Sequence, residues 1–192
     1  GRVAAWLAGE AWKLDAFRAF DSGEGTDLYI LAYAKSFNVP PADVPKKGPE
    51  RQIGKVEELM FQYGGGVGAW LTGAATYGID LNKMTDQVWP VLADWAKDEA
   101  AKFLQWLYET ENKKHEKRYL ALSRKFNDQV PQAEHDALLA QWSAAKLKAR
   151  YGLSEKTFIA CDAIKRLWRT AHPAISSYWK EIEETVREAI RN

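Results

Sequence analysis

Apolar residues recur at helical spacing along nearly the whole chain, and glycine and proline interrupt the pattern at intervals. No stretch alternates β-branched and polar residues for long enough to predict a strand. With 192 residues, of which 46% are hydrophobic, the chain is long enough to bury a sizeable core. The sequence therefore predicts an all-α fold in one domain, residues 1–192.

Glycine, proline and capping residues predict where the helices begin and end. We expect helices over residues 3–8, 11–20, 27–37, 49–63, 67–77, 154–169 and 173–191, and two or three more within 85–150, broken near Pro90 and residues 129–131. Asp27 or Thr26 is the expected N-cap of the third helix, and Ser154 that of the helix after Gly152. Residues 38–49, with four prolines, form a connector.

The charge balance excludes one class of protein. The chain has 27 Lys and Arg against 26 Asp and Glu, so it does not bind nucleic acid through a large net positive charge. Any phosphate-binding surface must be local. The basic run 113–118 is most simply a solvated helix face, with phosphate contact as the alternative.

The single cysteine and the lack of long apolar runs suggest a reducing, cytoplasmic setting. Cys161 lies in an apolar helical stretch and should pack as a small hydrophobic residue. No run approaches the roughly 18 apolar residues of a membrane span, and no leader pattern opens the chain. The first residue is Gly rather than Met, so we expect a piece of a longer protein.

Histidine and tryptophan predict no separate site. His115, His135 and His172 have no Cys or carboxylate at ligand spacing, so we expect no metal there and solvated or capping roles. The tryptophans at 70, 89, 95, 106 and 142 are expected to pack inward rather than to serve as stacking platforms.

One segment, residues 51–64, has a pattern that points to ligand binding. Its side chains Arg51, Lys55, Leu59 and Tyr63 are spaced by four. Four residues turn about 400° on an α-helix, so these side chains form a stripe roughly 18 Å long, hereafter the 51–63 stripe. Ile53, Val56 and Met60 lie on an adjacent face and should bury the helix.

Two interpretations of the 51–63 stripe remain open from spacing alone. The cations could bind triphosphate oxygens while the apolar and aromatic side chains pack on sugar and base. Alternatively, Arg51 and Lys55 could pair with Glu50, Glu57 or Glu58 on an exposed helix, with Leu59 and Tyr63 in the core.

The segment resembles motif B of family A DNA polymerases, in which Arg, Lys, an aromatic residue and Tyr-Gly follow at intervals of four. Arg51, Lys55, Tyr63 and Gly64 match this pattern. Leu59 is aliphatic where cellular members carry the aromatic that packs on the incoming sugar. The fuller segment, through the glycines at 64–66 to Trp70, is similar to the bacteriophage and prophage branch in particular.

The resemblance implies roles for these residues. Arg51, Lys55 and Leu59 would bind the incoming deoxynucleoside triphosphate (dNTP), with Lys55 as the catalytic proton donor to the leaving pyrophosphate. Tyr63 and Gly64 would contact the template. The implied protein is the helical fingers part of a DNA-directed DNA polymerase from a bacterium or phage-infected cell.

Other segments extend the resemblance. Gly1-Arg2 looks like the end of motif A, residues 12–37 and 168–192 look like the helices that flank the fingers, and 86–153 looks like a helical insertion. This divides the chain into residues 1–85, 86–153 and 154–192. The carboxylates that hold Mg²⁺ in such polymerases would lie outside the chain, so we expect it to hold no metal and to be inactive alone.

The implied partners are template-primer DNA, dNTP and the palm and thumb of a parent polymerase, with no membrane. Two alternatives remain: a catalytically inactive, polymerase-derived module that only binds DNA, and a helical interaction protein in which the 51–63 stripe is a salt-bridged surface. A motif A Asp upstream and a His-Asp-Glu motif downstream in the parent reading frame would favour the enzyme.

Overall fold

The computed structural model describes residues 1–191, and the all-α prediction is confirmed because these residues form helices and no strand. The α-helices are α1 (Arg2–Ala8), α2 (Ala11–Asp21), α3 (Leu28–Phe37), α4 (Pro49–Met60), α5 (Val67–Tyr77), α6 (Leu81–Val88), α7 (Asp94–Lys125), α8 (Gln132–Ala149), α9 (Glu155–Ala171) and α10 (Pro173–Arg191). Short 3₁₀ helices span Pro41–Asp43 and Phe61–Tyr63. No helix within residues 1–191 combines the length and apolar character of a membrane span.

The predicted caps are confirmed where the structure tests them. The Asp27 carboxylate accepts hydrogen bonds from the backbone N–H groups of Tyr29 (2.8 Å) and Ile30 (3.4 Å) at the start of α3. Ser154 Oγ accepts one from Thr157 N–H (3.1 Å) and caps α9. The helix predicted to begin at residue 85 begins instead at Leu81, where Asp80 caps it.

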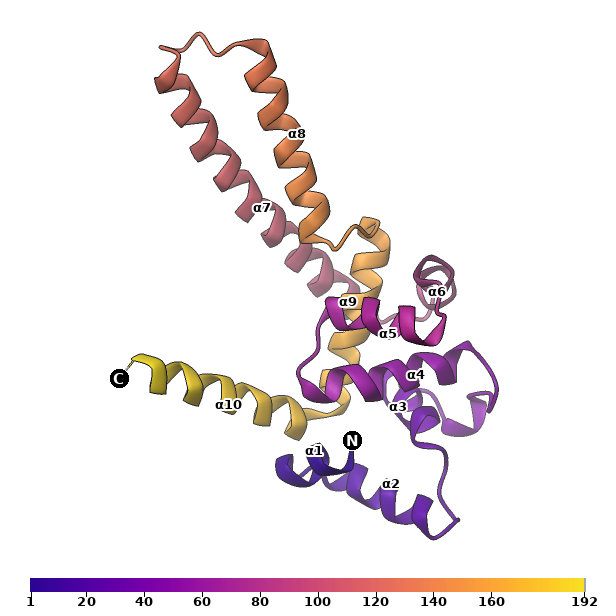
Figure 1. The fold of residues 1–192 in the computed structure, drawn as a ribbon. Helices are drawn as coiled ribbons and strands as arrows, with labels where there is room; N and C mark the ends of the chain where they lie inside the picture. The colour runs from indigo at the N-terminus through magenta and orange to yellow at the C-terminus, as the bar shows by residue number, and fades with distance from the viewer. Residues whose placement is uncertain (192) are drawn as a thin grey trace.

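Helix α9 forms the centre of the core, with α3, α5, α6, α7 and α10 packed around it (Figure 1). Its side chains Phe158, Ile164 and Trp168 are buried. The Phe61 ring meets Trp70 and Trp168 edge-on, at centroid distances of 5.8 and 5.9 Å. Such geometry satisfies the ring quadrupoles while burying a large apolar area. Cys161 is also buried, as predicted, and burial raises the pKa of its thiol to about 12.

Helices α3 and α4 cross at very short range, and Gly54 makes this possible. A Cβ atom at residue 54 would lie 2.0 Å from the carbonyl oxygen of Tyr29. No side chain fits there, so glycine at this position of α4 is a packing requirement. The contact fixes the height of α4 over α3 and thereby the position of the stripe.

Helices α7 and α8 form a long antiparallel hairpin that projects away from the core (Figure 1). Only the base of α7 is buried, through Ala96, Ala100 and Leu104, which face α9. Farther out, Trp142 Nε1 donates a hydrogen bond to Asn112 Oδ1 (3.0 Å), and Leu138 is the buried side chain of α8.

The expectation that the tryptophans of this region pack inward is wrong for two of them. Trp95 is 46% exposed and Trp106 is 57% exposed, while Trp89 and Trp142 are partly buried. The reason is that α7 touches the core along one narrow stripe of small residues, so side chains on its other faces meet solvent. Trp70, in the core proper, is fully buried as predicted.

We expect the outer hairpin to be dispensable for folding. Removing residues 112–142 and joining Glu111 to Ser143 through a short glycine linker should leave cooperative urea unfolding, because the core residues of α7 remain. The measurement is circular dichroism and tryptophan fluorescence across a urea titration. Loss of the cooperative transition would show that the hairpin belongs to the core.

Candidate functional site

The 51–63 stripe lies on the side of α4 that faces away from the core. Ile53 and Val56 are buried at 2% and 0% exposure and Met60 is partly buried, as the sequence predicted. Arg51, Lys55 and Leu59 remain partly exposed, and Tyr63, in the 3₁₀ turn after α4, is 64% exposed. Two basic, one apolar and one aromatic side chain are therefore accessible along α4 and the turn after it.

Arg51 is held by Asp27, a partner that the sequence analysis did not foresee. Its Nε and Nη2 donate to the same Asp27 oxygen at 3.0 and 2.7 Å. Burial alone would raise the pKa of Asp27, but the Arg51 hydrogen bond and the Tyr29 N–H outweigh burial and lower it. One carboxylate thus caps α3 and positions the guanidinium on α4.

The predicted alternative, in which Arg51 and Lys55 pair with neighbouring glutamates, does not occur. Within residues 1–191, no ion pair joins either cation to Glu50, Glu57 or Glu58. Glu57 and Glu58 are buried at 0% and 5% exposure, and Glu58 is paired with Lys13. Lys55 Nζ instead lies 4.1 Å from the centre of the Tyr77 ring, and no carboxylate of the described chain neutralises it.

A pocket of about 320 Å³ borders the stripe. Arg51 and Leu59 line it from α4, with Asp27 and Tyr29 from the start of α3 and Phe17 from α2. Gly1 also lines this pocket. The structure thus brings Arg51 and Leu59 to one hollow, whereas Lys55 and Tyr63 lie outside it on the same face.

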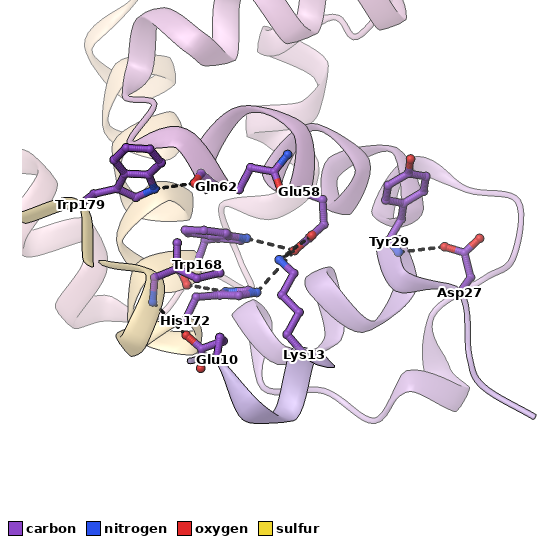
Figure 2. Close-up of polar contacts among 10 residues, drawn as sticks. Glu10, Lys13, Asp27, Tyr29, Glu58, Gln62, Trp168, His172 and Trp179 are labelled. Carbon is purple, nitrogen blue, oxygen red and sulfur yellow. Dashed lines mark hydrogen bonds and ion pairs between the residues drawn. The ribbon is translucent and has the colours of Figure 1, made fainter. Parts of the chain in front are cut away.

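Side chains of α9 and α10 contact the turn at Tyr63 and Gly64, hereafter the Tyr63–Gly64 corner. The Tyr63 ring meets the Trp179 ring at a centroid distance of 6.4 Å, and Trp179 Nε1 donates to the Gln62 carbonyl (2.6 Å; Figure 2). Arg169 Nη2 donates to the carbonyls of Gly64 (3.3 Å) and Gly65 (3.4 Å). Arg169 adds a cation beside the predicted template contact, and no sequence signal linked it to a loop 105 residues away.

Beneath the stripe, a buried polar cluster fastens α4 to α2 and α9 (Figure 2). Lys13 Nζ donates to Glu58 Oε1 at 2.6 Å, and Trp168 Nε1 donates to the same oxygen at 3.4 Å. Lys13 and Glu58 are 1% and 5% exposed. Burial alone would raise the pKa of Glu58, but His172 and Lys13 lower it to about 2. Glu58 therefore stays charged.

His172 belongs to this cluster and is fully buried, so its capping role at the end of α9 is observed but a solvated role is wrong. Its Nδ1 lies 2.8 Å from the Trp168 carbonyl, which can only accept, so Nδ1 carries the proton. Burial lowers the pKa of His172, and its Nε2 lies 3.4 Å from Glu58 Oε1. The ring stacks on Trp168 at a centroid distance of 4.1 Å.

The described residues contain no group of three His, Cys, Asp or Glu side chains that could hold a metal ion. Two carboxylates of the α4 region are ion-paired, Asp27 with Arg51 and Glu58 with Lys13, and Glu57 is fully buried. The donor set of residues 1–191 thus does not fit a catalytic Mg²⁺ site.

Comparison with known proteins relates part of the chain to a viral enzyme. Over 88 residues the chain is 39% identical to the DNA polymerase of Bacillus phage SP02, and the match covers 45% of this chain. The same match covers 13% of the phage polymerase, so the chain spans a small part of that relative. No protein-family model matches the chain, and no solved structure matches it.

The buried cluster generates a prediction about stability. Glu58→Gln leaves the Lys13 ammonium buried without a counter-charge, and we expect a loss of about 3–5 kcal/mol at pH 7. Because the folded-state pKa of Glu58 is lowered to about 2 from a usual 4.5, its contribution is complete above about pH 4.5 and disappears as the pH falls toward 2. Urea unfolding at pH 7 and pH 3 measures the difference.

Glu57 supplies the matched control. It is adjacent to Glu58 and also buried, and its pKa is shifted in the opposite direction. Burial raises the pKa of Glu57 well above its usual value, so the fold disfavours its charged form. Glu57→Gln should therefore cost little at pH 5 and become stabilising relative to the unaltered chain as the pH rises. Equal losses in both variants would contradict the Lys13–Glu58 assignment.

Proposed function

We propose that this chain is the fingers part of a phage-type family A DNA polymerase and that it binds the incoming dNTP and the template strand. The observation that carries the proposal is the 51–63 stripe, which resembles motif B at Arg51, Lys55 and Tyr63 and lies beside a pocket. The similarity of 88 residues to a phage DNA polymerase also supports it.

Arg51 binds the triphosphate. Its planar fork can hold two oxygens of one phosphate, and it already borders the pocket that Leu59 lines. Asp27 keeps the guanidinium extended across this pocket, at 2.7 Å from Nη2. A triphosphate therefore finds Arg51 already oriented and shares it with Asp27.

Lys55 is the catalytic residue of the proposal. It lies one turn after Arg51 on the same face and has no carboxylate partner within residues 1–191, so its charge is available to neutralise the departing pyrophosphate. The ammonium can also donate a proton to that leaving group. Contact with the Tyr77 ring holds Lys55 without cancelling its charge.

Leu59 and the Tyr63–Gly64 corner serve the nucleoside and the template. Leu59 presents an apolar surface to the sugar from the wall of the pocket. The exposed Tyr63 ring offers a face on which a templating base can stack, and Gly64 allows backbone to approach closely. Arg169, bound to the Gly64 carbonyl, adds positive charge where a template phosphate would pass.

The chemistry of nucleotide addition needs Mg²⁺, which this part of the protein does not hold. By the motif A resemblance, the metal-binding carboxylate of the parent would precede Gly1. Gly1 lines the same pocket as Arg51 and Leu59. Carboxylates joined there would enter beside the triphosphate, and this supports the proposed arrangement.

We expect the 192-residue chain alone to give no primer extension with Mg²⁺ and all four dNTPs, because the proposal places the metal-binding carboxylates of the parent outside it. The measurement is gel-resolved extension of a labelled primer. Adding a known polymerase to the same mixture controls for inhibitors. Template-dependent extension that copurifies with the chain through a further column would contradict the proposal.

In the complete parent polymerase, Lys55→Ala should lower incorporation about 10- to 150-fold, since it removes a charge-assisted phosphate contact of about 1.5–3 kcal/mol. Arg51→Ala should weaken dNTP binding, and Arg51→Lys should recover part of it. Tyr63→Ala should leave dNTP affinity near normal and disturb template positioning. Single-turnover kinetics with varied dNTP separates these effects.

Lys46→Ala is the matched control, because Lys46 is an exposed lysine on the connector before α4. It should incorporate nucleotide at the parental rate. The salt-bridged-surface alternative expects every one of these variants to behave like Lys46→Ala, with at most about 1 kcal/mol of lost stability. Parental kinetics in both Arg51→Ala and Lys55→Ala would remove the basis of the proposal.

A further inference from the structure

The outer half of α7 carries a cluster of basic side chains that is not part of the site proposed on α4. Six of the chain's 27 Lys and Arg lie within residues 113–125, with one acidic residue, Glu116, among them. These six, hereafter the arm cations, are Lys113, Lys114, Lys117, Arg118, Arg124 and Lys125. All six are exposed.

The arm cations share one side of the helix. At about 100° per residue they fall within an arc of about 140°. The partner helix α8 contacts other sides of α7: Asn112 bonds Trp142, His115 stacks on the Trp142 ring at 5.1 Å, and Tyr119 meets His135 at 6.1 Å. These contacts fall outside the arc, so most of the arm cations face solvent, while Arg118 and Lys125, at one edge of the arc, border the groove between α7 and α8.

Most of the arm cations also have no acidic partner, which distinguishes them from the charged side chains of an ordinary solvent-exposed helix. Within residues 1–191, only Lys114 among them has a carboxylate partner, Glu111 at 2.5 Å. On α10, by contrast, Arg187 pairs with Glu183 and Lys180 with Glu184, each at i,i+4 spacing. Outside residues 113–125 the chain has more acidic than basic side chains. A polyanion is therefore drawn to the outer arm.

We propose that the arm cations bind the sugar–phosphate backbone of DNA, as a second contact surface separate from the α4 site. The band extends about 18 Å along α7, and duplex DNA carries one charge per about 1.7 Å of axis, so the two charge arrays can run side by side. The choice of DNA over another polyanion rests on the proposed polymerase function. The contact is independent of base sequence, because contacts to phosphates carry no sequence information.

The test uses the 192-residue chain and fluorescence anisotropy with a labelled duplex and a labelled single strand of mixed sequence. The variant is Lys113→Gln/Lys117→Gln/Lys125→Gln, in which none of the three lysines has an ion-pair partner in the described chain. The control is Lys46→Gln/Lys47→Gln/Lys180→Gln, which removes the same charge from exposed positions elsewhere. Circular dichroism and melting temperature should be unchanged in both.

The arm variant should bind DNA about tenfold or more weakly, and the slope of log affinity against log salt should shrink by about 2 to 3 between about 50 and 200 mM salt. The control should keep the affinity and slope of the unaltered chain. Loss on the duplex, on the single strand or on both supports the contact and identifies the strand form that the arm binds.

Equal losses in the arm variant and the control would reduce the effect to net charge and overturn the inference, as would an absence of DNA binding by the unaltered chain. Neither result bears on the roles proposed for Arg51 and Lys55, which are tested by the kinetics of nucleotide incorporation. Conversely, failure of the Lys55→Ala prediction would leave an arm-specific loss of DNA affinity standing. The two proposals therefore fail separately.

Discussion

The charged contact between Lys13 and Glu58 is the interaction on which the arrangement of this fold depends. Lys13 comes from α2, Glu58 from α4, and their neighbours Trp168 and His172 from α9. Two opposite charges in an apolar interior tolerate little displacement, because either one left alone carries a large desolvation cost. The cluster therefore fixes three helices relative to one another more tightly than apolar packing alone would.

The Lys13–Glu58 ion pair also affects the outer surface of α4. Glu58 lines the same pocket as Arg51 and Leu59, so its ion pair with Lys13 holds the wall of that pocket, and the close approach at Gly54 sets how far α4 stands from α3. Asp27 then fixes Arg51 from the side. The surface that we propose for nucleotide binding is thus supported from below by an ion pair and from its edge by a helix cap, so its geometry exists before any ligand arrives.

Much of the local structure could be predicted from the sequence, because its causes are local. Gly64, Pro49, Asp27 and Ser154 each act on the few residues beside them, and the helices begin or end there. The partial exposure of Arg51 and Lys55 also followed from periodicity.

The tertiary contacts could not be predicted in this way. Arg51 meets Asp27 across 24 residues, and Arg169 reaches Gly64 across 105, which no periodicity encodes. The same limit explains the tryptophans: composition predicts that Trp95 and Trp106 are buried, but a helix that leaves the core exposes them.

Helix α7 has a mechanical property that follows from its continuity. It runs for 32 residues, about 48 Å, from a base packed on α9 to the end of the hairpin without a break. A stiff rod anchored at one end acts as a lever, so a load at the tip becomes a torque at Ala96, Ala100 and Leu104. Those residues bear on α9, and the far end of α9 holds Trp168 and His172 against Glu58. A load at the tip of the hairpin would therefore act first on the contact between α7 and α9.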